Sequence, residues 1–384
     1  MPRGCLRRSE RRSAAGCLFP PSVMFREERR QTSPATPMGI TVRAVDLETE
    51  EHELLAVLQR NLSDLPHARR FSWLYRNNPL GPARSWLARD SISGQAVGVA
   101  SVFRRAVWIG PRLRLGGQVG DFAIDPGYRT LGPALMLQRA TFGPVDSGEL
   151  AFCYDCPPDN RGMSTFRRLG MTSGATMARY ARLLRADRQV TRWLGHGLLA
   201  AGARPLANVL TGLGPRRSRA RALEIAVHRS RFDEEFSVLD EGVGGDDVIR
   251  GRRAAEDLNW RYRDDPVNDY EVLTARRRGE LHGFIVLAVD EEDAFVVDLF
   301  GRLESEEAAA LLEAGARHLA ETRVQTLHAL ISVGSRQDVA LGRSRFRLRN
   351  LGPSIVAYMR RNDDDRALLE GSLAWDFTRS DVMA

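Results

Sequence analysis

The sequence contains no lysine, so its 56 basic residues are all arginine. We interpret this absence as a compositional bias of the source genome, because selection for phosphate contacts would not remove every surface lysine. The net charge is +7, but eight arginines and three glutamates place +5 of it in residues 1–37. The nearly neutral remainder argues against a protein dedicated to nucleic acids.

Cysteines and long apolar runs are also scarce. Four cysteines in 384 residues are too few for a disulfide framework, which favours a reducing, cytoplasmic setting. No stretch reaches the roughly 20 apolar residues of a membrane span. Cys153 and Cys156 form a lone CxxC pair without a second pair or a histidine cluster nearby, so we expect no metal site.

The first 37 residues show no apolar periodicity and are broken by proline. They are expected to be a disordered tail, a targeting peptide or translated sequence upstream of the true start. Met38 is followed at once by the strand-like ITVRAV, which fits a start at that position. The remaining length suits two domains of roughly 100–200 residues each.

A repeated phrase supports that division. FSWLYRNNP at residues 71–79 returns as LNWRYRDDP at residues 258–266. Strand and helix patterns follow each copy in the same order, and this period is far too long for a solenoid, which indicates duplicated domains. We expect the Trp and Tyr of each copy to pack a helix against its own sheet, with the proline ending that helix.

The predicted organisation has five parts. They are the tail at 1–37, a first domain at 38–186, a helical linker at 187–230, a second domain at 231–362 and a C-terminal tail at 363–384. Alternating apolar segments predict a mixed α/β fold in each domain. We expect residues 178–186 and 353–361 to be strands that close the sheets of their own domains.

The stretch VGDFAIDPGYRTLGPALMLQRA at residues 119–140 predicts an anion site. A buried strand ends at a turn, and Arg129-x-x-Gly132-x-Ala134 opens a helix. Free N–H groups and the helix dipole favour a negative charge there, small residues allow close approach, and an arginine fork suits phosphate oxygens.

This stretch, followed by a strand and by PDN…FRRLGM, resembles the GCN5-related N-acetyltransferase (GNAT) superfamily over about residues 40–185. The similarity is especially to tandem GNAT-like proteins associated with polysaccharide biosynthesis. It implies two tandem domains, each a mostly antiparallel mixed sheet with a central V-shaped splay flanked by helices. It also implies an acyltransferase that moves an acyl group from acetyl-CoA or another acyl-CoA to an amine or hydroxyl of a small-molecule or sugar acceptor, acting without a metal as a monomeric pseudo-dimer.

The resemblance also assigns roles to residues. The pantetheine arm would pair with the main chain of Phe122, Ala123 and Ile124. The pyrophosphate would lie on Arg129, Thr130, Leu131, Gly132, Pro133 and Ala134. Asp159 or Asn160 would cap the next helix beside the cofactor, and Phe166 would lie against the thioester.

This sequence departs from the family pattern where chemistry is expected. Pro133 has no N–H to donate. Phe166 stands where many members have a tyrosine that acts as the general acid toward the leaving thiolate. Gln118 stands where a glutamate often serves as the base. The candidate replacements are Asp121, as a base with a raised pKa or as a structural carboxylate, and Tyr154 or Asp155. Arg76 and Asn78 are candidate acceptor contacts.

The second domain lacks the phosphate loop. FGRLESEEAAALLEAG at residues 300–315 replaces it, and its glutamates would repel a pyrophosphate. We therefore predict that acyl-CoA binds the first domain alone. Two alternatives stay open: aminoacyl transfer from charged tRNA to a cell-wall precursor, and a catalytically degenerate acyl-CoA-binding module.

Overall fold

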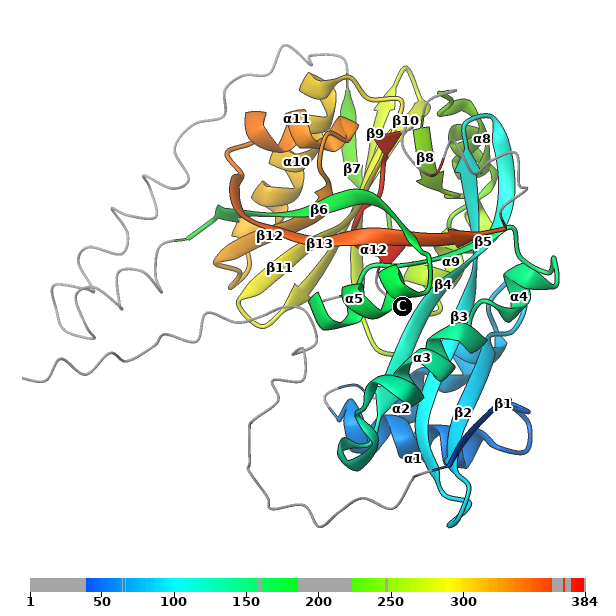
Figure 1. Ribbon diagram of the computed structural model, residues 1–384. Helices are drawn as coiled ribbons and strands as arrows, with labels where there is room; N and C mark the ends of the chain where they lie inside the picture. The colour runs from blue at the N-terminus through cyan, green and yellow to red at the C-terminus, as the bar shows by residue number, and fades with distance from the viewer. Residues whose placement is uncertain are drawn as a thin grey trace, which may run out of the picture.

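The computed structural model describes residues 39–185, 223–360, 369 and 374–382, apart from residues 64, 66, 158, 159, 246 and 247. The predicted N-terminal tail and most of the predicted linker lie outside these ranges. Within them, no helix is long and apolar enough to cross a membrane. The mixed α/β fold class predicted from the sequence is confirmed (Figure 1).

The first half is built of interspersed strands and helices. They are β1 (Ile40–Ala44), α1 (Glu51–Asn61), α2 (His67–Phe71), the π-helix η1 (Ser72–Arg76), β2 (Arg84–Asp90), β3 (Ala96–Ile109), β4 (Arg112–Ile124), the 3-10 helix η2 (Pro126–Tyr128), α3 (Leu131–Ala140), α4 (Gly143–Asp146), β5 (Phe152–Asp155), α5 (Asn160–Arg168) and β6 (Thr172–Leu183).

The second half repeats much of this order. It holds β7 (Glu224–Val227), α8 (Glu234–Gly242), β8 (Val248–Gly251), α9 (Ala255–Tyr262), β9 (Tyr270–Arg277), β10 (Glu280–Asp290), β11 (Asp293–Gly301), α10 (Ser305–Ala320), β12 (Thr326–Ser332), α11 (Arg336–Arg343), β13 (Arg347–Met359), β14 (Ala374–Trp375) and α12 (Arg379–Val382).

One sheet of 14 strands runs through both halves. Its main path is β1-β2-β3-β4-β5-β13-β6-β12-β11-β10-β9-β7, so β13 of the second half pairs with β5 of the first. Reciprocally, β6 of the first half pairs with β12 of the second. Figure 1 shows β6 and β13 side by side where the halves meet, and the two strands pair antiparallel.

This exchange corrects one prediction. The segments expected to close the two sheets are strands, but each closes the sheet of the other half rather than its own. Local sequence determines that a segment is extended, whereas its pairing partner depends on long-range packing. The domain bounds given above therefore remain a proposal.

Two layers of helices cover the strands of the first half. On one face, α1 and α2 bury Leu58 and Phe71 against Phe103 of β3. On the opposite face, α3 buries Leu137 against Ile124 of β4. The helix α5 packs on the same face as α3, which it contacts. The first half is therefore a helix-sheet-helix sandwich, with β4 accessible to both layers.

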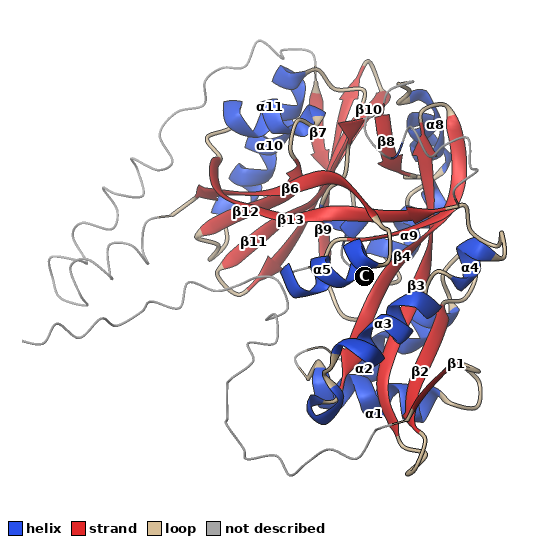
Figure 2. Ribbon diagram, viewed as in Figure 1, coloured by secondary structure: helices blue, strands red, loops and turns tan. Residues whose placement is uncertain are grey.

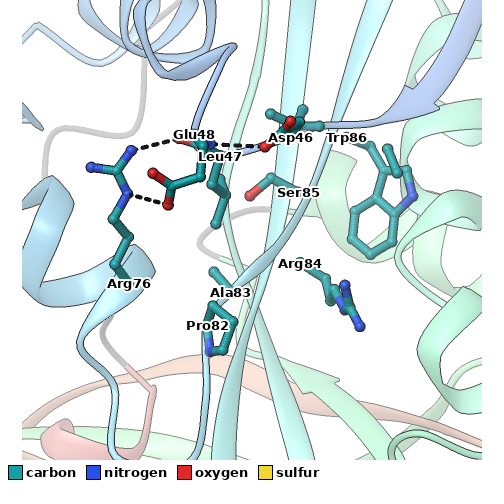
Figure 3. A pocket seen from close by; sticks show the side chains of 11 residues that line it. Asp46, Leu47, Glu48, Arg76, Pro82, Ala83, Arg84, Ser85 and Trp86 are labelled. Carbon is teal, nitrogen blue, oxygen red and sulfur yellow. Dashed lines mark hydrogen bonds and ion pairs between the residues drawn. The ribbon is translucent and has the colours of Figure 1, made fainter.

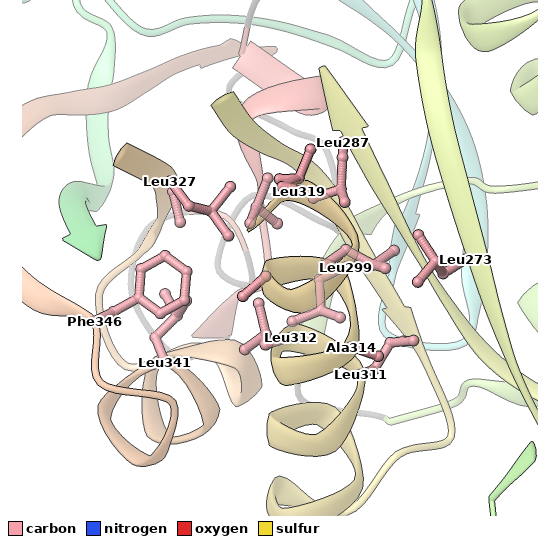
Figure 4. Packing of buried hydrophobic residues seen from close by; sticks show 14 of the residues in the cluster. Leu273, Leu287, Leu299, Leu311, Leu312, Ala314, Leu319, Leu327, Leu341 and Phe346 are labelled. Carbon is pink, nitrogen blue, oxygen red and sulfur yellow. The ribbon is translucent and has the colours of Figure 1, made fainter. Parts of the chain in front are cut away.

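The second half buries its own apolar core under α10 and α11. Leu311, Leu312 and Leu319 repeat on the buried side of α10 at helical spacing, and they pack with Leu299 of β11 and Leu341 of α11 (Figure 4). Figure 2 shows these two helices as a layer beside the strands of the second half.

Residues 374–382 lie inside the molecule, although they belong to the segment predicted as a C-terminal tail. β14 pairs with β8 in parallel. Trp375 and Phe377 join Tyr154 and Ile249 in a cluster built from both halves. These aromatic side chains are 4% and 0% exposed, so this segment is part of the core.

The repeated phrase adopts a helical turn in both halves. In the first copy, Asn77 N–H donates to the Ser72 carbonyl at 2.9 Å, which closes the π-helical turn before Pro79. The expectation that each tryptophan packs against its own half holds for Trp73, which packs on the core of the first half, but it is wrong for Trp260. Trp73 and Trp260 stack on each other, and Trp260 is buried in the core of the first half.

Candidate active site

β4 and β5 separate from each other beyond Gln118 and Tyr154, a place that we call the parting of the strands. These parallel strands pair from Gly116–Phe152 to Gln118–Tyr154, and β4 then continues to Ile124 without β5. Beyond Gln118, the edge of β4 that faced β5 is free of that ladder. Such an edge can pair by main chain with an extended ligand.

A β-bulge lies just beyond the parting. The pairing of β4 with β3 shifts register between Gly120, the partner of Ser101, and Ala123, the partner of Val99. Asp121 in this bulge has a φ of +46°, a left-handed conformation that is unfavourable for a residue with a side chain. The bulge turns the strand immediately before residues 122–124, the segment predicted to pair with pantetheine.

The N-terminus of α3 is open. Thr130 is the N-cap residue, but its side chain makes no capping hydrogen bond. Leu131 is 47% exposed, and a side chain at Gly132 would meet no atom within 4 Å. Pro133 brings no N–H, so the first two residues of α3 supply the N–H groups that an anion would meet.

The corresponding helix of the second half, α10, is closed. Glu304 is its N-cap residue, and it forms a reciprocal capping box with Glu307. Glu307 also pairs with Arg277. The two carboxylates satisfy the N–H groups of Glu304 and Glu307, and they place negative charge where a phosphate would bind.

Arg129 has a different orientation from the one predicted. Its Nε donates to the Ile124 carbonyl at 2.8 Å, and its Nη2 donates to Asn61 Oδ1 at 3.0 Å. Asn61 in turn donates to Asp125 at 2.6 Å. In this structure Arg129 fixes the turn before α3 to the end of α1, so its effect on a phosphate would come from its charge and from the loop that it holds.

Asp121 is a structural partner of the repeated phrase. It accepts hydrogen bonds from Arg70 and from the Tyr75 hydroxyl, the latter at 2.7 Å. Burial alone would raise its pKa, but the Arg70 guanidinium and these hydrogen bonds outweigh burial, so the pKa is lowered, which agrees with the structural alternative and not with a base of raised pKa. In the second half Asp298 accepts from the Tyr262 hydroxyl at 3.1 Å in the same way.

Tyr154 and Phe166 are both enclosed. The Tyr154 hydroxyl donates to the Asp381 carbonyl at 2.8 Å, and burial raises the pKa of this phenol. Phe166 is 2% exposed and packs with Met163 and Cys153. The Tyr154 hydroxyl is therefore engaged away from a ligand on β4, and the Phe166 ring has no proton to donate.

Asp155 lies one residue beyond the last pair of the β4–β5 ladder, at the end of β5. Its side chain alternates with Tyr154 and so falls on the α5 face, like that of Cys153. Its Oδ1 accepts from Cys156 N–H at 2.7 Å. Burial raises the pKa of Asp155 to about 7, and the hydrogen bond from Cys156 N–H lowers it by less.

The two candidate acceptor contacts are both engaged with protein groups. Arg76 lines a cavity of about 490 Å³ at the edge of β1 and β2, where it pairs with Glu48 at 3.3 Å (Figure 3). Asn78 is 5% exposed and donates to the Arg104 carbonyl at 3.0 Å. No lining residue of this cavity belongs to the parting of the strands or to the start of α3.

Two more predictions concern the helix cap and metals. α5 begins at Asn160, but the side chain of this residue, like the whole of Asp159, lies outside the described residues. Among the residues that the structure does describe, no three His, Cys, Asp or Glu side chains gather as a metal site.

Comparisons by sequence give no relative. No known protein-family profile matches the chain, and no curated protein sequence matches it.

Solved structures, in contrast, are similar in fold. A GCN5-related N-acetyltransferase from Anabaena variabilis superposes with a TM-score of 0.59 at 11% identity, covering 87% of this chain and 81% of that one. A protein described as a probable N-acyltransferase from Enterococcus faecalis gives 0.58 at 13% identity, with 84% and 73% covered. A GCN5-related N-acetyltransferase from Kribbella flavida gives 0.51 at 16%, with 83% and 71% covered.

Each of these superpositions covers more than four fifths of the chain, so the similarity is not limited to one half. The chain therefore has the fold of the GCN5-related N-acetyltransferases, as the sequence predicted. At such low identities the comparison establishes the fold, and the activity has to be argued from the site.

Proposed function

We propose that the chain is an acyltransferase that uses acetyl-CoA or another acyl-CoA, with one working site in its first half. The observation that supports this proposal is the open N-terminus of α3, which follows the part of β4 that no longer pairs with β5. The capped N-terminus of α10 marks the second half as a supporting domain. The single chain thus serves as a pseudo-dimer with one donor site.

The donor would lie along these two features. Its pantetheine arm would hydrogen-bond to the main chain of residues 122–124, beyond the bulge. Its pyrophosphate would accept from the N–H groups of Leu131 and Gly132, within the positive end of the α3 dipole. Ion pairs and hydrogen bonds from α1 to the turn before α3 would keep this loop in place.

The acyl group would pass directly to an acceptor amine or hydroxyl of a small molecule or saccharide. The acceptor atom attacks the thioester carbonyl, a C–N or C–O bond forms, the C–S bond breaks, and coenzyme A leaves as a thiolate. The acceptor must lose a proton and the thiolate must gain one. Positioning of both substrates supplies much of the acceleration in such a transfer.

Asp155 is the best-placed group to carry that proton. It lies at the parting of the strands, and a pKa of about 7 lets its carboxylate accept a proton from the acceptor and return it to the thiolate. Asp121 and Tyr154 are less suited, because their polar atoms are engaged with Tyr75 and with the Asp381 carbonyl.

Calorimetric titration of the full chain with acetyl-CoA tests the donor site. We expect one binding site, and we expect Gly132→Glu to abolish it by placing a carboxylate at the start of α3. Gly143→Glu, at the exposed start of α4, is the matched control, since a side chain there also meets no atom within 4 Å. Equal binding by the two variants would contradict the proposed site.

Release of free thiol in the presence of candidate acceptors then separates an enzyme from a binding module. The enclosed Phe166 and the engaged Tyr154 hydroxyl are the observations that favour a module. Binding of acetyl-CoA without thiol release across a broad panel of amines and alcohols would support that second candidate.

A further inference from the structure

Two buried arginines, whose charges repel each other, lie near the last pair of the β4–β5 ladder. Arg105 of β3 is 4% exposed, and its Nε donates to Gln118 Oε1 at 3.0 Å. Its guanidinium carbon lies 5.1 Å from the Trp260 ring. Arg261, the next residue of α9, is 7% exposed and comes from the other half. The pair therefore joins the two halves beside the parting of the strands.

These arginines have hydrogen-bond donors to spare. Nη1 of Arg105 and both Nε and Nη1 of Arg261 are buried without a hydrogen-bond partner in the part of the chain described. Nη1 of Arg261 lies 3.9 Å from Oδ1 of Asp381. Arg105 forms no ion pair with any described residue, and burial, followed by the repulsion of Arg261, lowers its pKa to about 10.

Other buried arginines of the molecule are paired. Arg250 bonds to Asp240, and Arg253 bonds to both Asp298 and Asp381. Buried guanidinium groups without a carboxylate are unfavourable unless an anion reaches them. By contrast, Arg105 has no carboxylate at ion-pair distance among the described residues, and Arg261 has only the long contact with Asp381.

The pair lies on the side of the sheet opposite the donor helix. Gln118 and Tyr154 are in register, and Tyr154 packs toward the second half with Ile249 and Phe377. The alternate residue of β5, Cys153, packs with α5, on the face that also carries α3. A donor on the α3 face and a group held by the arginines would thus approach the parting from opposite sides.

We propose that Arg105 and Arg261 bind a carboxylate carried by the acceptor, so that the enzyme acylates an amine or hydroxyl of a carboxylic acid such as an amino acid. This inference rests on the proposed function. Three unpartnered N–H-bearing nitrogens suit a small planar oxyanion. The negative charges of Asp257 and Asp381 also act on these arginines, which disfavours a doubly charged phosphate at the same place.

Direct titration tests the anion site without any turnover. The full chain is titrated with acetate and with the neutral acetamide, and we expect binding of acetate alone. Arg105→Met should weaken it by about tenfold or more. Arg104→Met is the matched control, since Arg104 is the neighbouring residue of β3 and pairs with Glu149 instead. Equal binding of acetate and acetamide, or no loss in Arg105→Met, overturns the proposal.

Arg105→Met is expected to fold, because an apolar chain of similar length replaces an unpaired buried charge. If it does not fold, Arg261→Met removes the other arginine from a different element and tests the same site. Loss of acetate binding in a folded variant, judged by an unchanged unfolding transition, supports the proposal.

Acyl transfer to amino acids and to the matching amino acid amides provides the second test. We expect the acids to be used with a KM at least about tenfold lower, and we expect Arg105→Met to remove that difference while leaving the KM for acetyl-CoA unchanged. Equal use of acids and amides by the unaltered enzyme overturns the inference. Failure of acetyl-CoA to bind contradicts the proposed function instead, and acetate binding then decides the anion site by itself.

Discussion

Trp73 and Trp260 form a reciprocal pair across the junction of the two halves. Their ring centroids lie 5.1 Å apart. Trp73 Nε1 donates to the Trp260 carbonyl at 2.7 Å, and Trp260 Nε1 donates to the Trp73 carbonyl at 3.1 Å. A mutual contact of this kind is what a two-fold axis produces between identical subunits. Here it relates two halves of one chain, so the repeated phrase marks their interface.

The pair should stabilise the whole molecule. We expect Trp73→Ala to lower the free energy of unfolding by about 3 kcal/mol, because it leaves a cavity and an unpaired carbonyl at the junction. Urea denaturation of Trp73→Ala, Trp260→Ala and the double variant measures the coupling, expected at about 1 kcal/mol. Strictly additive losses would show that the two rings do not depend on each other.

The strand exchange predicts that neither half folds alone. In a fragment ending at residue 185, β5 lacks β13, and β6 loses both of its partners, β12 and β13, so β6 is left without any strand to pair with. We expect this fragment to lack a cooperative unfolding transition, and we expect co-expression with residues 223–384 to restore one. Circular dichroism and gel filtration provide the readout. A monomeric fragment that unfolds cooperatively would contradict the exchanged pairing.

Local patterns in the sequence predicted much of the fold. The apolar, β-branched run YEVLTARR at residues 270–277 predicts a strand and forms β9, and the periodic run at residues 305–321 predicts a helix and forms α10. Both segments have a clear periodicity, which depends only on neighbouring residues. The open start of α3 was also predictable, because Gly132 and the preceding turn form a local signal.

The remaining features depend on contacts between distant segments. Nothing in residues 178–186 indicates that this strand would pair with β12 of the second half, as Leu183 does with Thr326. Arg105 and Arg261 were missed for the same reason. A charged residue inside the apolar strand VFRRAVW was the available signal, but its partner on α9 could not be inferred from spacing.

Asp121 is expected to act on stability rather than on proton transfer. Asp121→Asn would leave the buried Arg70 without its carboxylate, at a cost of about 3 kcal/mol in the free energy of unfolding. Asp298→Asn in the second half, which removes a carboxylate from Arg253, should behave alike. Thermal unfolding and the pH dependence of acyl transfer are measured together. A rate loss of about 100-fold with unchanged stability would instead identify Asp121 as the base.

Asp155 should determine the pH dependence of acyl transfer. Burial raises its pKa to about 7, so the rate should increase as pH rises through 7 and the carboxylate forms. The nearby Cys153 and Cys156 thiols stay neutral there, because burial raises their pKa values too. Asp155→Asn should lower the rate of acyl transfer and remove its increase through pH 7. Asp146→Asn, a control at a surface carboxyl that bonds to Tyr358, should keep it.

The same carboxyl should also affect stability, with a defined sign. Its pKa is about 7 in the folded chain and roughly 4 when unfolded, so the folded state holds the proton more tightly. The resulting stabilisation is complete below about pH 4 and is lost as pH rises through 7. Asp155→Asn should therefore flatten the decline in stability between about pH 4 and 7, as measured by urea unfolding at each pH. An unchanged slope would contradict the raised pKa of Asp155, and a rate that still increases through pH 7 in Asp155→Asn would place the titrating group of the reaction elsewhere.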